Sequence, residues 1–327
     1  MVKAQEFTVG LAHDELQLGP VTVSFQRTLR IPETGLHPLP PGLGRFPLRR
    51  VEDYPDTAPA EWLARGGVML PIYQREAMWL SFDASEPAAL QVGVGKVCAV
   101  SGLPWIEHLV KDPQNYVVLP DQPWLDGISA GDGFIRQFVA VPLGSGATVE
   151  GQVTGQETHG GVQLRAVGLT EQALAAWHAA QRVSPVYCEP ALGEVPLACA
   201  SASMGLGAGG RMRQEVYADD RPHADYDESG ARRLFVHLCS AAQWTAITGE
   251  VPPPTPVDRD AYVRAGLPWF DYYAADAHDL AASEILARVE SVGKKLGAEE
   301  DPFVPVDSTA VIALGGVSPD AVADGKW

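Results

Sequence analysis

The stretch GPVTVSFQRTLRI, residues 19–31, carries the clearest structural pattern in the sequence. A glycine-proline pair typical of turns comes first, and apolar residues then alternate with polar ones, with Arg27 as the only interruption. The alternating apolar residues are Val21, Val23, Phe25, Leu29 and Ile31. Because successive side chains of a strand point to opposite faces, this pattern predicts an early strand with one buried face.

Turn residues separate the other apolar runs, which favours antiparallel pairing over repeated strand-helix-strand units. We predict strands at residues 67–70, 90–100, 116–119 and 134–143, and a hairpin that joins residues 149–154 to residues 162–167. Helices are predicted at residues 60–65, 171–182 and 279–296, the last with an apolar stripe and ion pairs four residues apart. The sequence therefore predicts an α+β fold that is strand-rich, with mainly antiparallel sheet and a few helices, the longest near the C-terminus.

The length of 327 residues fits about two domains or one large one. A soft boundary near Gly168 separates an antiparallel β-rich region, residues 1–168, from a mixed α/β region, residues 169–297. Residues 298–327 are predicted to form a partly mobile C-terminal tail. A single domain is the alternative.

Composition and charge exclude several classes of protein. Apolar residues make up 46% of the chain, which is typical of a globular protein, and 24 basic residues against 41 acidic ones give a net charge of −17. Such a chain repels a phosphate backbone, so we predict no nucleic-acid partner. No apolar run matches a signal peptide or a bilayer span, which predicts a cytoplasmic protein with no membrane partner. The four cysteines are far apart in the sequence and predict no metal site.

Four blocks of sequence are distinctive: PLPPGLGRFPLRRVEDY (residues 38–54), GGVMLPIYQREAMWLSF (66–82), MGLGAGGRMRQEVY (204–217) and GLPWFDYY (266–273). Together they resemble a family of uncharacterised bacterial proteins, over most of the chain. The resemblance implies no activity and no cofactor.

The third block contains GLGAGGR, residues 205–211, which formally satisfies the dinucleotide-binding pattern G-x-G-x-x-G. Its flanks lack the preceding apolar strand and the following helix that such a fold requires. We expect instead a flexible turn or a site of close backbone packing. A further alternative is an anion-binding nest beside Arg211 and Arg213.

A proline-tryptophan pair followed by an apolar residue and an acid occurs three times. The tryptophans and acids are Trp105 and Glu107, Trp124 and Asp126, and Trp269 and Asp271. Aromatic faces beside carboxylates bind sugars or organic cations, whereas the alternative is that these tryptophans anchor the core.

Two further groups of charged residues stand out. Arg75 and Glu76 lie between apolar runs and predict a partly buried network, with an exposed face or a structural ion pair as the alternatives. Residues 219–228 are rich in acids and predict a solvated loop, with a divalent-cation site as the alternative. His237 and Cys239 would share one side of a strand, as ordinary core residues.

These observations predict a ligand- or partner-binding protein of unassigned activity, whose partner is a small molecule or a protein. The candidate binding residues are Arg75, Glu76, Trp124, Asp126, Arg211, Arg213, Trp269 and Asp271. We expect them to meet in one cavity. The alternatives are a hydrolase or carbohydrate-active enzyme with paired acids such as Asp126 and Asp271, and a structural protein that self-assembles or forms a homo-oligomer.

Overall fold

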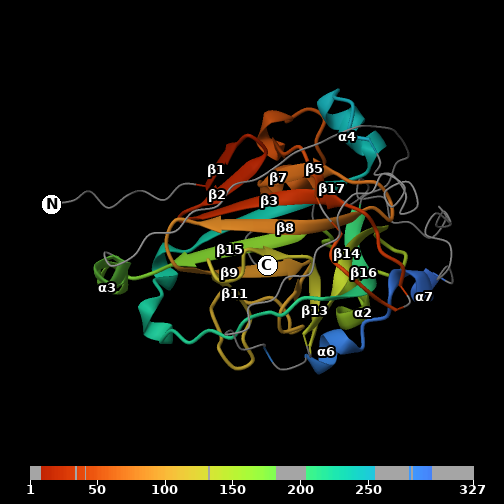
Figure 1. Cartoon of the computed structure of the whole chain (residues 1–327). Helices are drawn as coiled ribbons and strands as arrows, with labels where there is room; N and C mark the ends of the chain where they lie inside the picture. Colours follow the sequence, from red (N-terminus) through yellow and green to blue (C-terminus); the bar gives the residue numbers. More distant parts are fainter. Residues whose placement is uncertain are drawn as a thin grey trace.

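The computed structural model describes residues 9–33, 35–40, 42–131, 133–181, 204–254, 280 and 283–296. In this part of the chain two mostly antiparallel sheets dominate and the helices are short (Figure 1). The predicted strand-rich α+β fold class is confirmed. None of the described helices is long and apolar enough to cross a membrane. The predicted C-terminal tail lies outside the described residues.

Ten strands form the first sheet: β1 (Val9–Ala12), β2 (Glu15–Leu18), β3 (Val21–Thr28), β4 (Leu36–His37), β5 (Gly42–Arg45), β8 (Ala77–Ala84), β12 (Trp124–Leu125), β13 (Gly127–Gly131), β14 (Phe134–Pro142) and β16 (Met204–Arg213). Their order is β1-β2-β3-β8-β14-β16-β4, with β5 beside β3, β12 beside β8 and β13 beside β14. Only the pairing of β4 with β16 is parallel.

Seven strands form the second sheet: β6 (Arg49–Arg50), β7 (Val68–Pro71), β9 (Ala88–Val94), β10 (Val97–Cys98), β11 (Val117–Leu119), β15 (Val162–Gly168) and β17 (Arg232–Cys239). Their order is β10-β9-β15-β17-β7-β6, with β11 beside β9. Only the pairing of β17 with β7 is parallel.

The main hydrophobic core lies between the two sheets. Val21, Val23 and Phe25 of β3 are fully buried there, in one cluster with Leu90 and Val92 of β9. The early strand with a buried face is thus confirmed. Strands that follow Gly168 in the sequence complete both sheets, since β16 belongs to the first and β17 to the second.

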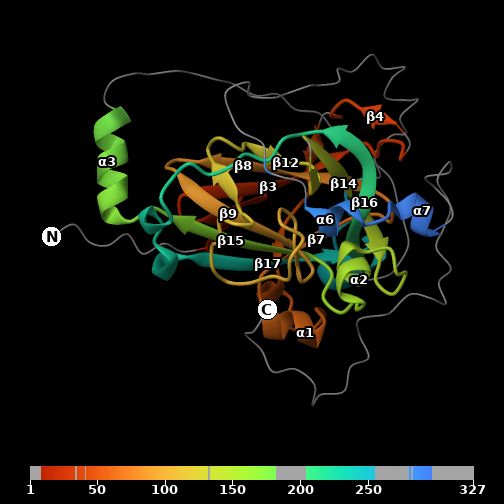
Figure 2. The same cartoon turned by 90° about the horizontal axis from the view of Figure 1, so that it is seen from below.

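The described helices are α1 (Ala60–Arg65), α2 (Val149–Thr154), α3 (Glu171–Gln181), α4 (Ala241–Thr248), α6 (Glu284–Ala287) and α7 (Val292–Leu296), with 3-10 turns η1 (Val51–Asp53), η2 (His223–Asp225) and η3 (Glu228–Gly230). Helix α3 lies at one end of the molecule, and α2, α6 and α7 lie at the other (Figures 1 and 2). The predictions of α1 and α3 are confirmed.

The predicted hairpin over residues 149–154 is wrong, because these residues form helix α2. The side chain of Thr148 accepts a hydrogen bond from the N–H of Gly151, and Gly155 ends the helix in the left-handed conformation. The two valines of the segment are four residues apart, a spacing that fits a helix as well as a strand.

The predicted long helix near the C-terminus is also wrong. Its described part forms two short helices, α6 and α7, of four and five residues. Leu286 and Val289 enter the main core, whereas Val292 packs in a separate cluster with Val139 and Ala147. The apolar residues therefore pack in two different clusters, and the chain bends between Val289 and Val292.

His237 and Cys239 share one side of a strand, as predicted, because both lie in β17. The ring of His237 stacks on Trp62 with centroids 4.6 Å apart, and its Nε2 atom lies 2.9 Å from the Gly66 carbonyl oxygen. Burial lowers the pKa of His237 to about 3. The imidazole is therefore a neutral core residue at physiological pH.

Candidate anion-binding site

Two arginines face each other across the pairing of β14 with β16, where β14 begins and β16 ends. Arg136 is the register partner of Arg211, and Phe134 is the partner of Arg213. Side chains two residues apart on a strand share a face, so all four side chains lie on the same face of the sheet. We refer to Arg136 and Arg211 as the arginine pair.

A β-bulge in β16 brings Arg211 to this face. At the bulge β14 contributes only Gln137, whereas β16 contributes both Gly209 and Gly210. A one-residue shift reverses the face to which each following side chain points, so the extra residue directs Arg211 to the side of Arg136. An added Cβ on Gly210 would lie 2.2 Å from a neighbouring backbone carbonyl oxygen. The bulge therefore requires glycine at this position.

This geometry corrects the prediction of a turn over residues 205–211, because all of them lie in the strand β16. The alternative of close backbone packing is confirmed: an added Cβ on Gly207 would lie 2.5 Å from Val292 Cγ2. The glycines form an extended strand and not an anion-binding nest, so any anion must be bound by the arginine side chains.

Arg136 is half-buried, and its Nε atom is buried without a hydrogen-bond partner among the described residues. Burial is the main cause that lowers the pKa of Arg136, and the charge of Arg211 lowers it further, while Glu33 acts in the opposite direction. Within the described ranges, no carboxylate forms an ion pair with either member of the arginine pair.

Arg211 is exposed, and its guanidinium group contacts an aromatic ring. The guanidinium carbon lies 4.6 Å from the centroid of the Phe134 ring. Such a cation–π contact contributes about 0.5–1 kcal/mol at an exposed site. The contact with Phe134 therefore favours positions of this guanidinium group near the start of β14.

Glu33 is the nearby carboxylate, and other groups already neutralise it. It forms an ion pair with Arg30, and its two oxygens accept hydrogen bonds from the N–H of Gly293 at 2.7 and 2.8 Å. The side chains of Arg30 and Glu33 are only 8% and 4% exposed, so the pair is buried. Because Arg30 already neutralises Glu33, this carboxylate does not cancel the charge of the arginine pair.

Trp124 and Asp126 lie at a different place from the arginines. Asp126 is buried, and its carboxylate accepts hydrogen bonds from the Gln214 amide at 2.9 Å and from the Trp124 side chain. Burial raises the pKa of Asp126 to about 7. Trp124 packs against Met212, whose side chain points to the opposite face of β16 from Arg211.

Trp105, a second proline-linked tryptophan, lies at a different place from Trp124. Trp105 is buried against the second sheet, where an added Cβ on Gly93 would lie 2.6 Å from its ring. Trp269 and Asp271 lie outside the described residues.

Arg75 and Glu76 lie in a third place, inside the protein. The Glu76 carboxylate lies 3.3 Å from the Arg27 guanidinium and accepts a hydrogen bond from the N–H of Tyr73 at 2.9 Å. Burial raises the pKa of Glu76 to about 7, although Arg27 opposes this effect. Arg75 adopts a positive φ of 66° and donates its N–H to the Ala140 carbonyl oxygen at 2.6 Å. Glu76 thus forms a buried ion pair with Arg27, and the alternative of an exposed face is wrong for Arg75 and Glu76.

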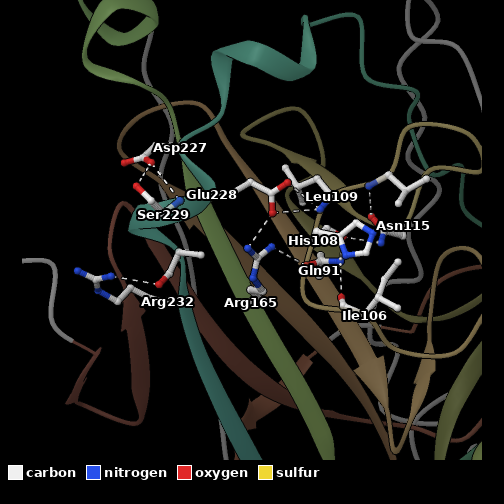
Figure 3. A network of polar contacts seen from close by, with 12 residues as sticks. Gln91, Ile106, His108, Leu109, Asn115, Arg165, Asp227, Glu228, Ser229 and Arg232 are labelled. Carbon is white, nitrogen blue, oxygen red and sulfur yellow. Dashed lines mark hydrogen bonds and ion pairs between the residues drawn. The ribbon is translucent and has the colours of Figure 1, made fainter. Parts of the chain in front are cut away.

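The acidic segment over residues 219–228 is bound to the second sheet by a polar network (Figure 3). Arg165 of β15 donates hydrogen bonds to Gln91 Oε1 at 2.9 Å and to Glu228 Oε2 at 2.8 Å. The carboxylate of Glu228 also accepts the N–H of Leu109 at 3.1 and 3.2 Å.

The prediction that this segment is simply solvated is therefore wrong for both of its ends. Asp219 is buried and accepts a hydrogen bond of 2.6 Å from the hydroxyl of Tyr116, while Glu228 is paired as described above. Among the residues that the structure describes, no three side chains of the ligand-forming types are close enough to hold a metal ion.

Sequence reasoning found Arg211 and Arg213 but missed Arg136 and Phe134. The sequence offered one sign of Arg136: it is a charged residue near the start of residues 134–143, a stretch predicted to be an apolar strand. Comparisons with protein-family models, curated proteins and solved structures found no match, so the assignment of the site depends on its geometry.

Proposed function

We propose that this chain is a ligand-binding protein that takes an anionic ligand at the arginine pair. The observation that carries the proposal is the direct opposition of Arg136 and Arg211 across two strands, without an ion-pair partner among the described residues. Like charges directly opposite each other destabilise a sheet. A bound anion between them turns this repulsion into two attractive contacts.

The arginine side chain suits this role. A guanidinium group presents planar, charged donors that match the oxygens of carboxylates and phosphates. The Nε–H of Arg136 has no hydrogen-bond partner among the described residues, and the half-buried surroundings of this side chain strengthen an electrostatic contact relative to open water. The geometry of the arginine pair therefore suits anion binding better than a structural role.

The proposal narrows the binding function predicted from the sequence. It keeps Arg211 and Arg213 as candidate residues and adds Arg136, while Trp124 and Asp126 fall outside the site. The small-molecule partner and the cytoplasmic location predicted from the sequence are part of this proposal.

The geometry favours binding over acid–base catalysis. Asp126 and Glu76 have the raised pKa values typical of a general acid, but they are only 3% and 5% exposed. Each carboxylate is bound to neighbouring side chains instead of facing the arginine pair.

The proposal is tested by titrating the full chain with sodium sulfate at constant ionic strength, adjusted with sodium chloride, by calorimetry and by thermal unfolding. Removal of one charged donor weakens anion binding by about tenfold to a hundredfold. We therefore expect the wild-type chain to bind sulfate and Arg136→Met to bind it at least tenfold more weakly.

The matched control is Arg50→Met, which removes an arginine that is also partly exposed but belongs to the second sheet. This variant should bind sulfate as the wild type does. An absence of sulfate binding by the wild type, or an equal loss in the control variant, contradicts the proposal.

A further inference from the structure

The charge around the arginine pair indicates how many negative charges the ligand group carries. Arg136 and Arg211 contribute two positive charges, and Glu33 is the only carboxylate among the described residues whose charge acts on Arg136. Because Arg30 and Gly293 already bind Glu33, this carboxylate is not available to turn toward the pair. A ligand group with one charge would match only one of the two guanidinium groups.

The positions of the two guanidinium groups favour one compact group over two separated ones. Residues directly opposite in an antiparallel pair have Cα atoms about 4.5–5.5 Å apart. Arg211 is held over the ring of Phe134, and Arg136 presents a buried Nε–H. One tetrahedral oxyanion has enough oxygens to accept hydrogen bonds from both side chains at once.

From this charge and geometry we infer that the arginine pair binds a dianionic tetrahedral group, that of a phosphate monoester on a small molecule. The inference rests on the proposed function and specifies its ligand class. A phosphodiester has the same shape but only one charge, so the phosphate backbone of a nucleic acid is a poor ligand for this site. The net charge of −17 disfavours the same partner independently.

The test compares two probes that differ mainly in charge. Methyl phosphate is a dianion at pH 8, because its second pKa is about 6, whereas dimethyl phosphate is a monoanion of similar shape. We measure the binding of both to the full wild-type chain by calorimetry at pH 8 and constant ionic strength. Malonate, which carries two charges on separate carboxylates, is the third probe.

We expect methyl phosphate to bind at least tenfold more tightly than dimethyl phosphate and malonate. In Arg211→Met this preference over dimethyl phosphate should fall to about threefold or less, while Arg50→Met should keep it. Equal binding of the two phosphate esters, or tighter binding of malonate, overturns the inference and leaves an anion site in place. If no probe binds and sulfate does not bind either, the proposed function fails as well.

Discussion

Replacement of Arg136 by methionine tests the physical basis of the arginine pair, because it should stabilise the protein when no anion is present. The substitution removes a like-charge contact with Arg211, which costs about 0.2–1 kcal/mol in an antiparallel pair. It also removes a buried Nε–H without a described partner, a group whose burial costs about 1–3 kcal/mol.

Two opposing contributions reduce this gain. Methionine keeps most of the aliphatic packing of the arginine stem, so little apolar contact is lost. The attraction between Arg136 and Glu33 is lost, but Glu33 is already bound by Arg30. We expect a net increase of about 1 kcal/mol in the free energy of unfolding, which raises Tm by about 1–2 °C in a chain of this size.

The measurement is urea denaturation of the wild-type chain and of Arg136→Met in a dilute buffer without multivalent anions. With a saturating anion the wild type should become more stable than Arg136→Met. A ligand at a hundred times its Kd raises the free energy of unfolding of the wild type by about 2.7 kcal/mol and that of the variant much less. A variant that is less stable than the wild type by 1 kcal/mol or more in the dilute buffer would show that Arg136 is a structural residue, and would refute the reasoning.

Three further substitutions test the contacts that shape the rest of the molecule. Arg165→Met breaks the network of Figure 3 and should lower the free energy of unfolding by about 2–4 kcal/mol in urea denaturation, with faster hydrogen exchange in residues 219–230. Gly207→Ala places a Cβ 2.5 Å from Val292 Cγ2 and should cost about 1–3 kcal/mol, whereas Gly10→Ala, whose Cβ meets nothing closer than 3.7 Å, should change stability by about 0.5 kcal/mol or less. Asp126→Asn should reduce the pH dependence of stability. Burial raises the pKa of Asp126 from 3.8 to about 7, so the native state holds the proton of this carboxyl group more tightly than the unfolded state does. The unfolding free energy of the wild type therefore falls as pH rises from about 4 to 7, by at most about 1.4 kcal/mol per pH unit for this group. Urea curves of both proteins across that range check the last prediction, and parallel pH profiles would contradict it.

Regular alternation made much of the sheet structure predictable. The spacing of Val21, Val23 and Phe25 predicts their burial in β3, whereas the burial of the polar Ser24, Arg27 and Thr28 in the same strand does not follow from it. Helix α2 was mistaken for a strand because Val149 and Val153 are compatible with both periods. In such a case the capping residue and the glycine that follows decide the conformation, and these favour a helix.

The prediction of a long helix over residues 279–296 failed for a different reason. Its ion pairs do form, since Arg288 lies 3.3 Å from Glu284 and Lys294 lies 2.6 Å from Glu290. Pairs of this kind contribute only about 0.2–0.5 kcal/mol each, far less than the burial of one large apolar side chain. Burial of the apolar side chains in two separate clusters therefore outweighs the local preference for one helix.

The arginine pair depends on information that a single sequence does not display, namely which residues of two distant strands are opposite each other. Residues 136 and 211 are 75 positions apart, and their pairing follows from a bulge at Gly209 and Gly210. Glycines in a strand usually weaken it, so the run at residues 205–210 favoured a turn. In the folded chain these glycines allow close packing on one face of β16, and the bulge among them turns Arg211 to the other face. Close packing and the orientation of the charged side chain thus have the same cause, which explains why a glycine-rich stretch and Arg211 occur side by side in this sequence.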